Sequence, residues 1–304
     1  MQLLPKLNVP VCRPMPNIAN FAGGKNRKDM HKFSKLLLMS LPLLMLSHAM
    51  TAENRGKENC KTAIVAHRGY WNCEEAGYAK NSLAALKCAQ EAGFWGSEFD
   101  VNMTSDEVLL VYHDSEIDGK RIESTPYAEF KDVRLANGEP VPTVDDYLAQ
   151  VRRRPGTVMV YELKTHSTPE IENRLVDLTV EKLKEYGLDS PDKVIFISFS
   201  INICKRMAEL MPGYTVQYLS DDYSPDQLAE MGITGVDYHY NVFSSHPGWY
   251  DSARARSMSV NVWTVDSEED MVRMKDLGVD MLTTDCPDLA RRLFGVTERK
   301  AGDR

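Results

Sequence analysis

Beyond residue 60, apolar positions fall into short β-rich runs separated by helical segments, and this alternation repeats along the chain. The runs cover 62–67, 96–101, 157–164, 193–200, 214–219, 235–240, 259–265 and 279–284. Eight strand–helix repeats are the number that closes a (β/α)8 barrel of the TIM type. A doubly wound sheet is the alternative, but the G-x-G-x-x-G that often follows its first strand is missing. We therefore expect one barrel domain over residues 60–296.

Helix start and stop signals lie between these runs. The first helical segment should begin after Asn81 or Ser82 and stop at Gly93. The segment after the third run has a Thr168 cap followed by Pro169, which is favoured at the first helical position. These signals support strands and helices in strict alternation.

One further strand-like run does not fit the barrel count. The run at 109–114 follows the second strand after only a few polar residues, and a parallel crossover needs a dozen or more. It should therefore form a β-hairpin with its turn near 105–107, which brings His113 opposite Glu98 to Asp100. Residues 114–141 then form a small irregular insertion, with turn signals at 118–119 and 137–138.

Polar side chains stand at the carboxyl ends of three expected barrel strands. Alternate residues of a barrel strand point inward, so Glu98 and Asp100 share one face with each other. Glu162 and Lys164 share the inward face of the 157–164 strand, and His67 ends the first strand in the same way. Barrel enzymes place their active sites at this end of the strands.

Three inward carboxylates repel one another and lose hydration, so they need a positive partner. One divalent cation held by Glu98, Asp100 and Glu162 would supply it. All-oxygen ligation suits Mg²⁺ or Ca²⁺ rather than Zn²⁺. The alternative is a salt-bridge network in which Lys164 or Arg68 neutralises the acids.

Two histidines at one barrel mouth suggest acid–base chemistry. His67 and His113 are candidates for a general acid and a general base. Arg68 and Lys164 are candidates for phosphate contacts that stabilise the charge of a transition state.

Six short motifs, taken together and in this order, resemble the glycerophosphodiester phosphodiesterase family. They are HRG at 67–69, EFD at 98–100, HD at 113–114, ELK at 162–164, VWTV at 262–265 and TDCP at 284–287. The resemblance spans residues 66–288. It implies cleavage of a small glycerophosphodiester to an alcohol and glycerol phosphate. It also implies metal ligands (Glu98, Asp100, Glu162), an acid–base pair (His67, His113) and phosphate contacts (Arg68, Lys164).

The chain departs from the family pattern before its first helix. The family usually has Glu-Asn-Thr there, whereas this chain has Lys80 in the Glu position. The preceding loop is longer, and Glu74 or Glu75 could take over the missing role. We therefore expect the substrate pocket, rather than the metal site, to differ from that of other members.

Aromatic residues near the strand ends are candidates for contacts with the alcohol part of the substrate. Tyr70 and Trp263 are the two that we assign to the pocket, with Trp71 beside them. Packing at the rim or in the core is the alternative for all three.

Two other functions remain open at this point. A phospholipase D-type enzyme acting on intact lipids uses a similar barrel, but the Glu162–Lys164 pattern favours the glycerophosphodiesterase. A non-catalytic protein that captures glycerophosphodiesters is the second alternative, and the Lys80 departure leaves room for it.

The N-terminal residues have the layout of a secretory signal peptide. Lys32 and Lys35 precede an apolar run, and small residues follow around Ala49 and Ala52. We expect residues 1–52 to be removed, Met30 to be the true start, and the protein to be periplasmic or secreted. The apolar run is too short to span a membrane.

Charge and cysteine content argue against several classes of partner and cofactor. Without residues 1–49, the chain carries 29 basic and 43 acidic side chains, a net charge near −14. This excess argues against nucleic acid or an anionic membrane as partner. The processed chain keeps five cysteines and no C-x-x-C, so a zinc site is not expected and at least one thiol is unpaired.

Overall fold

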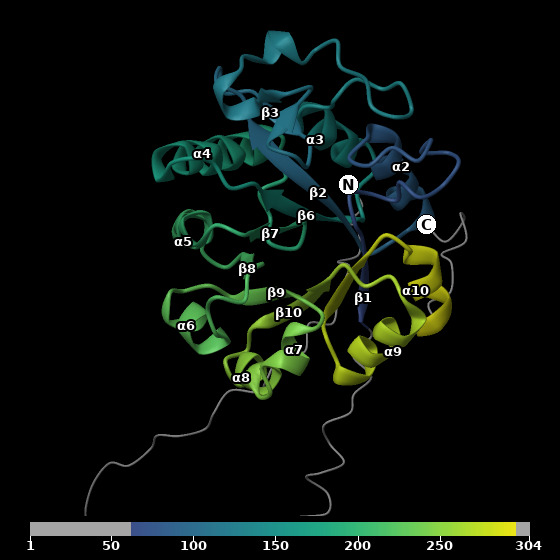
Figure 1. The fold of residues 1–304 in the computed structure, drawn as a ribbon, viewed down its shortest axis with the longest axis vertical. Coiled ribbons are helices and arrows are strands. Elements are labelled where there is room, and N and C mark those ends of the chain that lie inside the picture. The colour runs from purple at the N-terminus through teal and green to yellow at the C-terminus, as the bar shows by residue number, and fades with distance from the viewer. Residues whose placement is uncertain (1–61, 296–304) are drawn as a thin grey trace, which may run out of the picture. The chain divides into compact units, whose positions relative to one another are not determined.

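The computed structural model describes residues 62–295, which form a closed barrel of eight parallel strands surrounded by helices (Figure 1). Hydrogen bonding runs in the order β1-β11-β10-β9-β8-β7-β6-β2, and β1 also pairs with β2, which closes the barrel. The strands are β1 (Ala63–Ala66), β2 (Gly96–Met103), β6 (Val158–Leu163), β7 (Val194–Ser198), β8 (Thr215–Tyr218), β9 (Gly235–His239), β10 (Ser259–Trp263) and β11 (Met281–Thr284). The predicted barrel and its eight strands are confirmed.

Helices follow the strands in alternation, and their ends agree with the sequence signals. The Ser82 hydroxyl caps α2, which stops at Gly93, and Thr168 caps α4, which has Pro169 at its first position. The helices are α2 (Leu83–Ala92), α3 (Val144–Arg153), α4 (Pro169–Glu185), α5 (Ile201–Leu210), α6 (Pro225–Glu230), α7 (Val242–Ser245), α8 (Trp249–Ala255), α9 (Glu268–Leu277) and α10 (Pro287–Phe294).

The extra strand forms the predicted hairpin. β3 (Leu109–Val111) pairs antiparallel with β2, with Val101 opposite Val111. The Tyr112 amide donates to the Asp100 carbonyl at 3.0 Å, so the same register brings the next residue, His113, level with Phe99. The hairpin therefore returns His113 to the level of the acidic residues, as expected.

The insertion is more regular than the sequence suggested. It contains a small hairpin, β4 (Glu116–Ile117) with β5 (Lys120–Arg121), and two short 3-10 turns, η1 (Ile122–Ser124) and η2 (Tyr127–Glu129). Ile117, Ile122 and Phe130 are buried against Leu110 of β3. This small apolar cluster gives the insertion a core of its own, and turn signals alone did not reveal it.

Two apolar layers fix which way each strand residue faces. Inside the barrel, Val65, Val160 and Ile197 pack together. Outside it, Phe99 contacts the rings of Tyr147 and Tyr161, with centroids 4.9 and 4.7 Å away. Because successive strand residues alternate between the two layers, the outward Phe99 forces Glu98 and Asp100 into the barrel.

Gly69 links the end of β1 to the first helix, in a conformation that favours glycine. Its φ is +79°, and a Cβ at this position would lie 2.7 Å from Ala85 Cβ. We expect Gly69→Ala to lower the free energy of unfolding by roughly 2–4 kcal/mol, measured by urea denaturation.

The matched control is Gly119→Ala. Gly119 also has a positive φ, +74°, but nothing lies within 4 Å of the added Cβ. Only the backbone strain remains there, about 1 kcal/mol. Equal losses in the two variants would show that the contact with Ala85 carries no cost.

Within the described residues, the cysteines are free thiols: Cys73, Cys88, Cys204 and Cys286. Cys73 and Cys88 belong to one small cluster beside α2. Burial, and then the neighbouring Cys73, raise the pKa of the Cys88 thiol to about 12.

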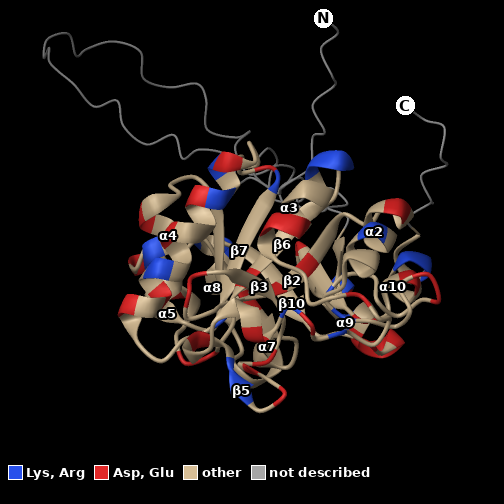
Figure 2. Cartoon of the chain, turned by 90° about the horizontal axis from the view of Figure 1, so that it is seen from above, with Lys and Arg blue, Asp and Glu red and all other residues tan. Residues whose placement is uncertain are grey.

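Charged residues of both signs are interspersed along the outer helices (Figure 2). Among residues 62–295, no helix has the length and hydropathy needed to cross a membrane. The predicted signal peptide, residues 1–52, lies outside the described residues.

Candidate active site

An acidic triad lies inside the barrel mouth, formed by Glu98 and Asp100 of β2 and Glu162 of β6. The three residues are 2%, 1% and 8% exposed, and one oxygen from each side chain lies within 4.8 Å of the others. Asp100 and Glu162 are register partners on adjacent strands. The structure thus brings together the three carboxylates that the sequence selected.

Two basic side chains neutralise part of the triad. Lys164 Nζ lies 2.6 Å from Glu162 Oε1 and 3.1 Å from Asp100 Oδ1. Arg68 Nε lies 3.5 Å from Asp100 Oδ2, and the Arg68 amide donates to Glu98 Oε2 at 2.7 Å. The salt-bridge network considered from the sequence therefore exists, and it is centred on Asp100.

Asn81 adds a neutral partner that sequence reasoning did not select as a site residue. Its side-chain Nδ2 donates to Asp100 Oδ2 at 2.8 Å, and its side-chain Oδ1 accepts from the backbone N–H of Asp100 at 3.3 Å. Burial opposes ionisation of Asp100, but Lys164, His113 and Asn81 outweigh it and lower the pKa of this carboxyl.

Three carboxylates face two basic side chains, so the network does not offset all of the negative charge of the triad. Burial, followed by repulsion from Asp100 and Glu162, raises the pKa of Glu98 well above its usual value. Burial and then Asp100 raise the pKa of Glu162 to about 7. Glu98 Oε1 is buried without a hydrogen-bond partner among the described residues. A hard divalent cation fits this set, since it would supply the missing charge and bind the orphaned oxygen.

His67 is oriented by a residue from the opposite end of the chain. Its Nδ1 lies 2.7 Å from Asp285 Oδ1, and its Nε2 lies 4.0 Å from Glu98 Oε2. Trp71 Nε1 donates to the same Asp285 oxygen at 2.9 Å. The Nδ1 contact leaves the other ring nitrogen facing the triad.

Asp285 was not selected from the sequence as a site residue, although it lies in the TDCP motif. β1 and β11 pair in parallel with Ala66 opposite Thr284, which makes His67 and Asp285 register neighbours. Closure of the barrel requires the first and last strands to pair. A polar residue directly after each of them was therefore the signal that could have revealed the contact.

We expect Asp285→Asn to lower kcat by roughly 10² to 10⁴-fold with a much smaller change in KM, because the carboxylate fixes the orientation and the tautomer of the His67 ring. Steady-state kinetics tests this. Asp288→Asn is the control, since Asp288 accepts a hydrogen bond from Tyr70 instead of contacting His67. A change in KM alone would contradict the positioning role.

His113 follows β3 on the hairpin. It lines a cavity of about 410 Å³ together with Glu162, Lys164 and Phe199. Its Nδ1 lies 2.6 Å from Asp114 Oδ1. Burial, and then the positive charge of Lys164, lower the pKa of His113. Neutral imidazole is the form that can accept a proton.

The two aromatic residues assigned to the pocket have different surroundings. Tyr70 donates its hydroxyl to Asp288 and packs edge-on against Phe94, 5.3 Å away, so it joins the first loop to α10 and does not line the cavity. Trp263 faces the barrel interior and contacts Phe199, which lines the cavity, at 5.5 Å between ring centroids.

Lys80 does not enter the triad. Its Nζ lies 4.4 Å from the ring centroid of Trp71, whose indole is bound to Asp285. Glu74 and Glu75 are exposed. Lys80, which replaces the usual glutamate of the family, therefore lies at the rim of the barrel near His67.

The described residues thus form a parallel barrel whose mouth contains a buried acidic triad able to hold a metal ion, at the end of the strands where barrel enzymes place their active sites. The Glycerophosphoryl diester phosphodiesterase family profile matches residues 67–289. The chain belongs to this family.

Similar proteins and solved structures support the same family assignment. A glycerophosphodiester phosphodiesterase from Caldanaerobacter subterraneus subsp. tengcongensis is 27% identical over 75% of this chain and 96% of its own length. The crystal structure of a glycerophosphodiester phosphodiesterase from Parabacteroides distasonis is 43% identical with a TM-score of 0.74, over 77% of this chain and 97% of that one. An Oleispira antarctica phosphodiesterase solved with sn-glycerol-3-phosphate shares the fold, at 22% identity and a TM-score of 0.67, over 77% and 96% of the two chains.

Proposed function

We propose that this protein is an exported, divalent-cation-dependent phosphodiesterase that hydrolyses a glycerophosphodiester to an alcohol and glycerol phosphate. The observation that supports this most is the buried triad of Glu98, Asp100 and Glu162, with His67 beside Glu98 and with His113 lining the same cavity as Glu162. Family membership supports the diester as substrate.

Each group near the triad has a chemical task in this proposal. A cation held by the triad would polarise the phosphoryl oxygens and offset their negative charge. Lys164 and Arg68 stand beside the same carboxylates and would bind the remaining phosphate oxygens. The basic pair and the cation together would stabilise the extra charge of the transition state.

The surroundings of the two histidines suggest different roles. The lowered pKa of His113 suits a base that removes the proton from the attacking hydroxyl, as the new P–O bond forms. His67, held by Asp285, would then donate a proton to the departing alkoxide as the second P–O bond breaks. Either water or the glycerol hydroxyl of the substrate could attack, and a cyclic phosphate product would identify the second.

Turnover of soluble diesters tests the function. Glycerophosphocholine, glycerophosphoethanolamine and glycerophosphoinositol would be incubated with the protein, with and without EDTA, followed by addition of Ca²⁺ or Mg²⁺. We expect turnover that EDTA removes and one cation restores. Turnover of intact lipids alone would indicate the phospholipase D-type activity, and binding without turnover would indicate the capture protein.

Export rests on the N-terminal pattern of Lys32, Lys35 and the apolar run that follows. Expression of the whole chain, followed by cell fractionation and N-terminal sequencing, tests it. We expect an exported product that starts near residue 53. A cytoplasmic product that keeps residues 30–52 would contradict export.

A further inference from the structure

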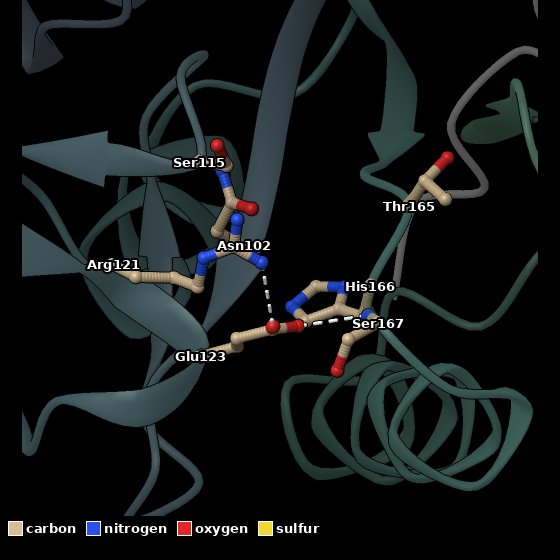
Figure 3. A pocket seen from close by; sticks show the side chains of 7 residues that line it. All are labelled: Asn102, Ser115, Arg121, Glu123, Thr165, His166 and Ser167. Atoms are coloured by element: carbon tan, nitrogen blue, oxygen red, sulfur yellow. Dashed lines mark hydrogen bonds and ion pairs between the residues drawn. The ribbon is translucent and has the colours of Figure 1, made fainter.

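A second cavity, of about 240 Å³, opens beside the one that contains His113 (Figure 3). It lies between the insertion and the loop that joins β6 to α4. The two cavities share Asn102, Ser115 and Thr165. A diester whose phosphate lies at the triad could therefore extend one of its ends into this second cavity.

The walls of the second cavity are polar. Ser115, Arg121 and Glu123 come from the insertion, and Thr165 and Ser167 lie across from them on the β6–α4 loop (Figure 3). The Glu123 carboxylate accepts from Arg121 Nη1 at 3.2 Å and from the Ser167 amide at 2.9 Å. This carboxylate joins the two walls and gives the cavity a defined shape.

The available groups match a polyol. Within the described part of the chain, the hydroxyls of Ser115 and Thr165 have no hydrogen-bond partner, so both can donate to and accept from a ligand. Glu123 offers an acceptor and Arg121 offers donors. No aromatic ring lines the cavity, other than the buried imidazole of His166. A quaternary ammonium group would lack the aromatic faces that usually bind it.

His166 closes this cavity as a structural residue. Its Nδ1 contacts the Lys164 carbonyl at 2.8 Å, and its Nε2 accepts from the Met103 amide at 3.2 Å. Both ring nitrogens are therefore used, and the ring links β2 to the loop that follows β6. This arrangement holds Thr165 and Ser167 in place on the cavity wall.

We propose that this second cavity is a subsite for a polyol head group, on the alcohol side of the diester. The proposal rests on the proposed function. None of its lining residues belongs to the six motifs shared with the family. The glycerol phosphate part is common to all such substrates, whereas the alcohol part varies, so residues outside the motifs are suited to read the varying part.

The test compares kcat/KM for glycerophosphoinositol with kcat/KM for glycerophosphocholine. We expect the full chain to favour the inositol diester. In the double variant Ser115→Ala/Thr165→Val, this ratio should fall about tenfold, because two hydrogen bonds to the head group are lost. Thr125→Val is the matched control, since Thr125 lies on the same insertion but outside the cavity, and the ratio should not change.

Two outcomes would overturn the subsite. An equal fall for both diesters would place the common glycerol end in this cavity, and an unchanged ratio would show that the cavity does not contact the substrate. A binding experiment separates failure of the subsite from failure of the proposed function. In it, calorimetry measures binding of the two diesters to the cation-loaded His67→Ala variant. Tighter binding of the inositol diester, lost with Ser115→Ala/Thr165→Val, would support the subsite even if the parent protein hydrolysed neither diester.

Discussion

Glu98→Gln is expected to lower cation-dependent turnover roughly a thousandfold or more, because a metal-stabilised transition state draws several kcal/mol from its ligands. In the parent protein, the backbone N–H of Arg68 donates to Glu98 Oε2. The glutamine side chain has the same size as glutamate, and its amide oxygen can still accept this hydrogen bond. It removes the negative charge that the buried Oε1 would bring to a cation.

Although Glu98→Gln should lose activity, we do not expect its thermal stability in EDTA to fall. In EDTA, the three buried carboxylates repel one another, and the pKa of Glu98 is raised by burial and by its two acidic neighbours. Replacing this carboxylate with a neutral amide relieves that cost. We therefore expect Glu98→Gln to melt at the same temperature as the parent protein in EDTA, or at a higher one, while losing most of the stabilisation that added cation gives.

Asp237→Asn is the matched control for this experiment. Asp237 is another buried acid, on β9, 1% exposed and not a member of the triad. Its replacement should leave cation-dependent turnover in place. Full activity of Glu98→Gln at the parent cation concentration would show that the triad does not hold the metal.

His67→Ala and His113→Ala are each expected to lower kcat for natural diesters by roughly 10² to 10⁴-fold, the usual contribution of a general acid or base. His67 lies at the end of β1 with its Nε2 4.0 Å from Glu98 Oε2, and His113 lies on the hairpin, where it lines a cavity together with Glu162. Cation binding, measured by calorimetry, should persist in both variants because neither ring belongs to the triad.

A change of leaving group assigns the two roles. A glycerol diester of 4-nitrophenol releases a stable phenolate, which needs no proton from the enzyme. His67→Ala should lose far less activity with this diester than with glycerophosphocholine, whereas His113→Ala should lose activity with both. The opposite pattern would exchange the acid and the base. Equal losses in both variants with both substrates would contradict separate roles.

The inward direction of the acidic residues could be predicted because it follows from local chemistry. Period-two alternation places Glu98 and Asp100 on one face, and the large apolar Phe99 must point to the other. The hairpin was also predictable, since the few residues after Met103 are too short for a parallel crossover. In both cases, the deciding residues lie within a few positions of one another.

The remaining contacts could not be predicted in this way. The Asp285–His67 pair depends on closure between β1 and β11, which are separated by most of the barrel sequence. Tyr70 follows the HRG motif, yet its hydroxyl is bound by Asp288 from α10, so it serves in packing. The second cavity combines the insertion with the β6–α4 loop, and nothing local to either segment shows that they meet.

The amino-acid sequence by itself determined the strand count, the inward carboxylates and the family, because alternation and short motifs are local properties of the chain. Tertiary structure decided which of the polar residues act together. Distances across a barrel depend on register and closure, and a one-residue shift would turn every inward side chain outward. The division of charge within the triad, the orientation of His67 by Asp285 and the polar cavity beside His113 therefore emerge only when all eight strands are in register.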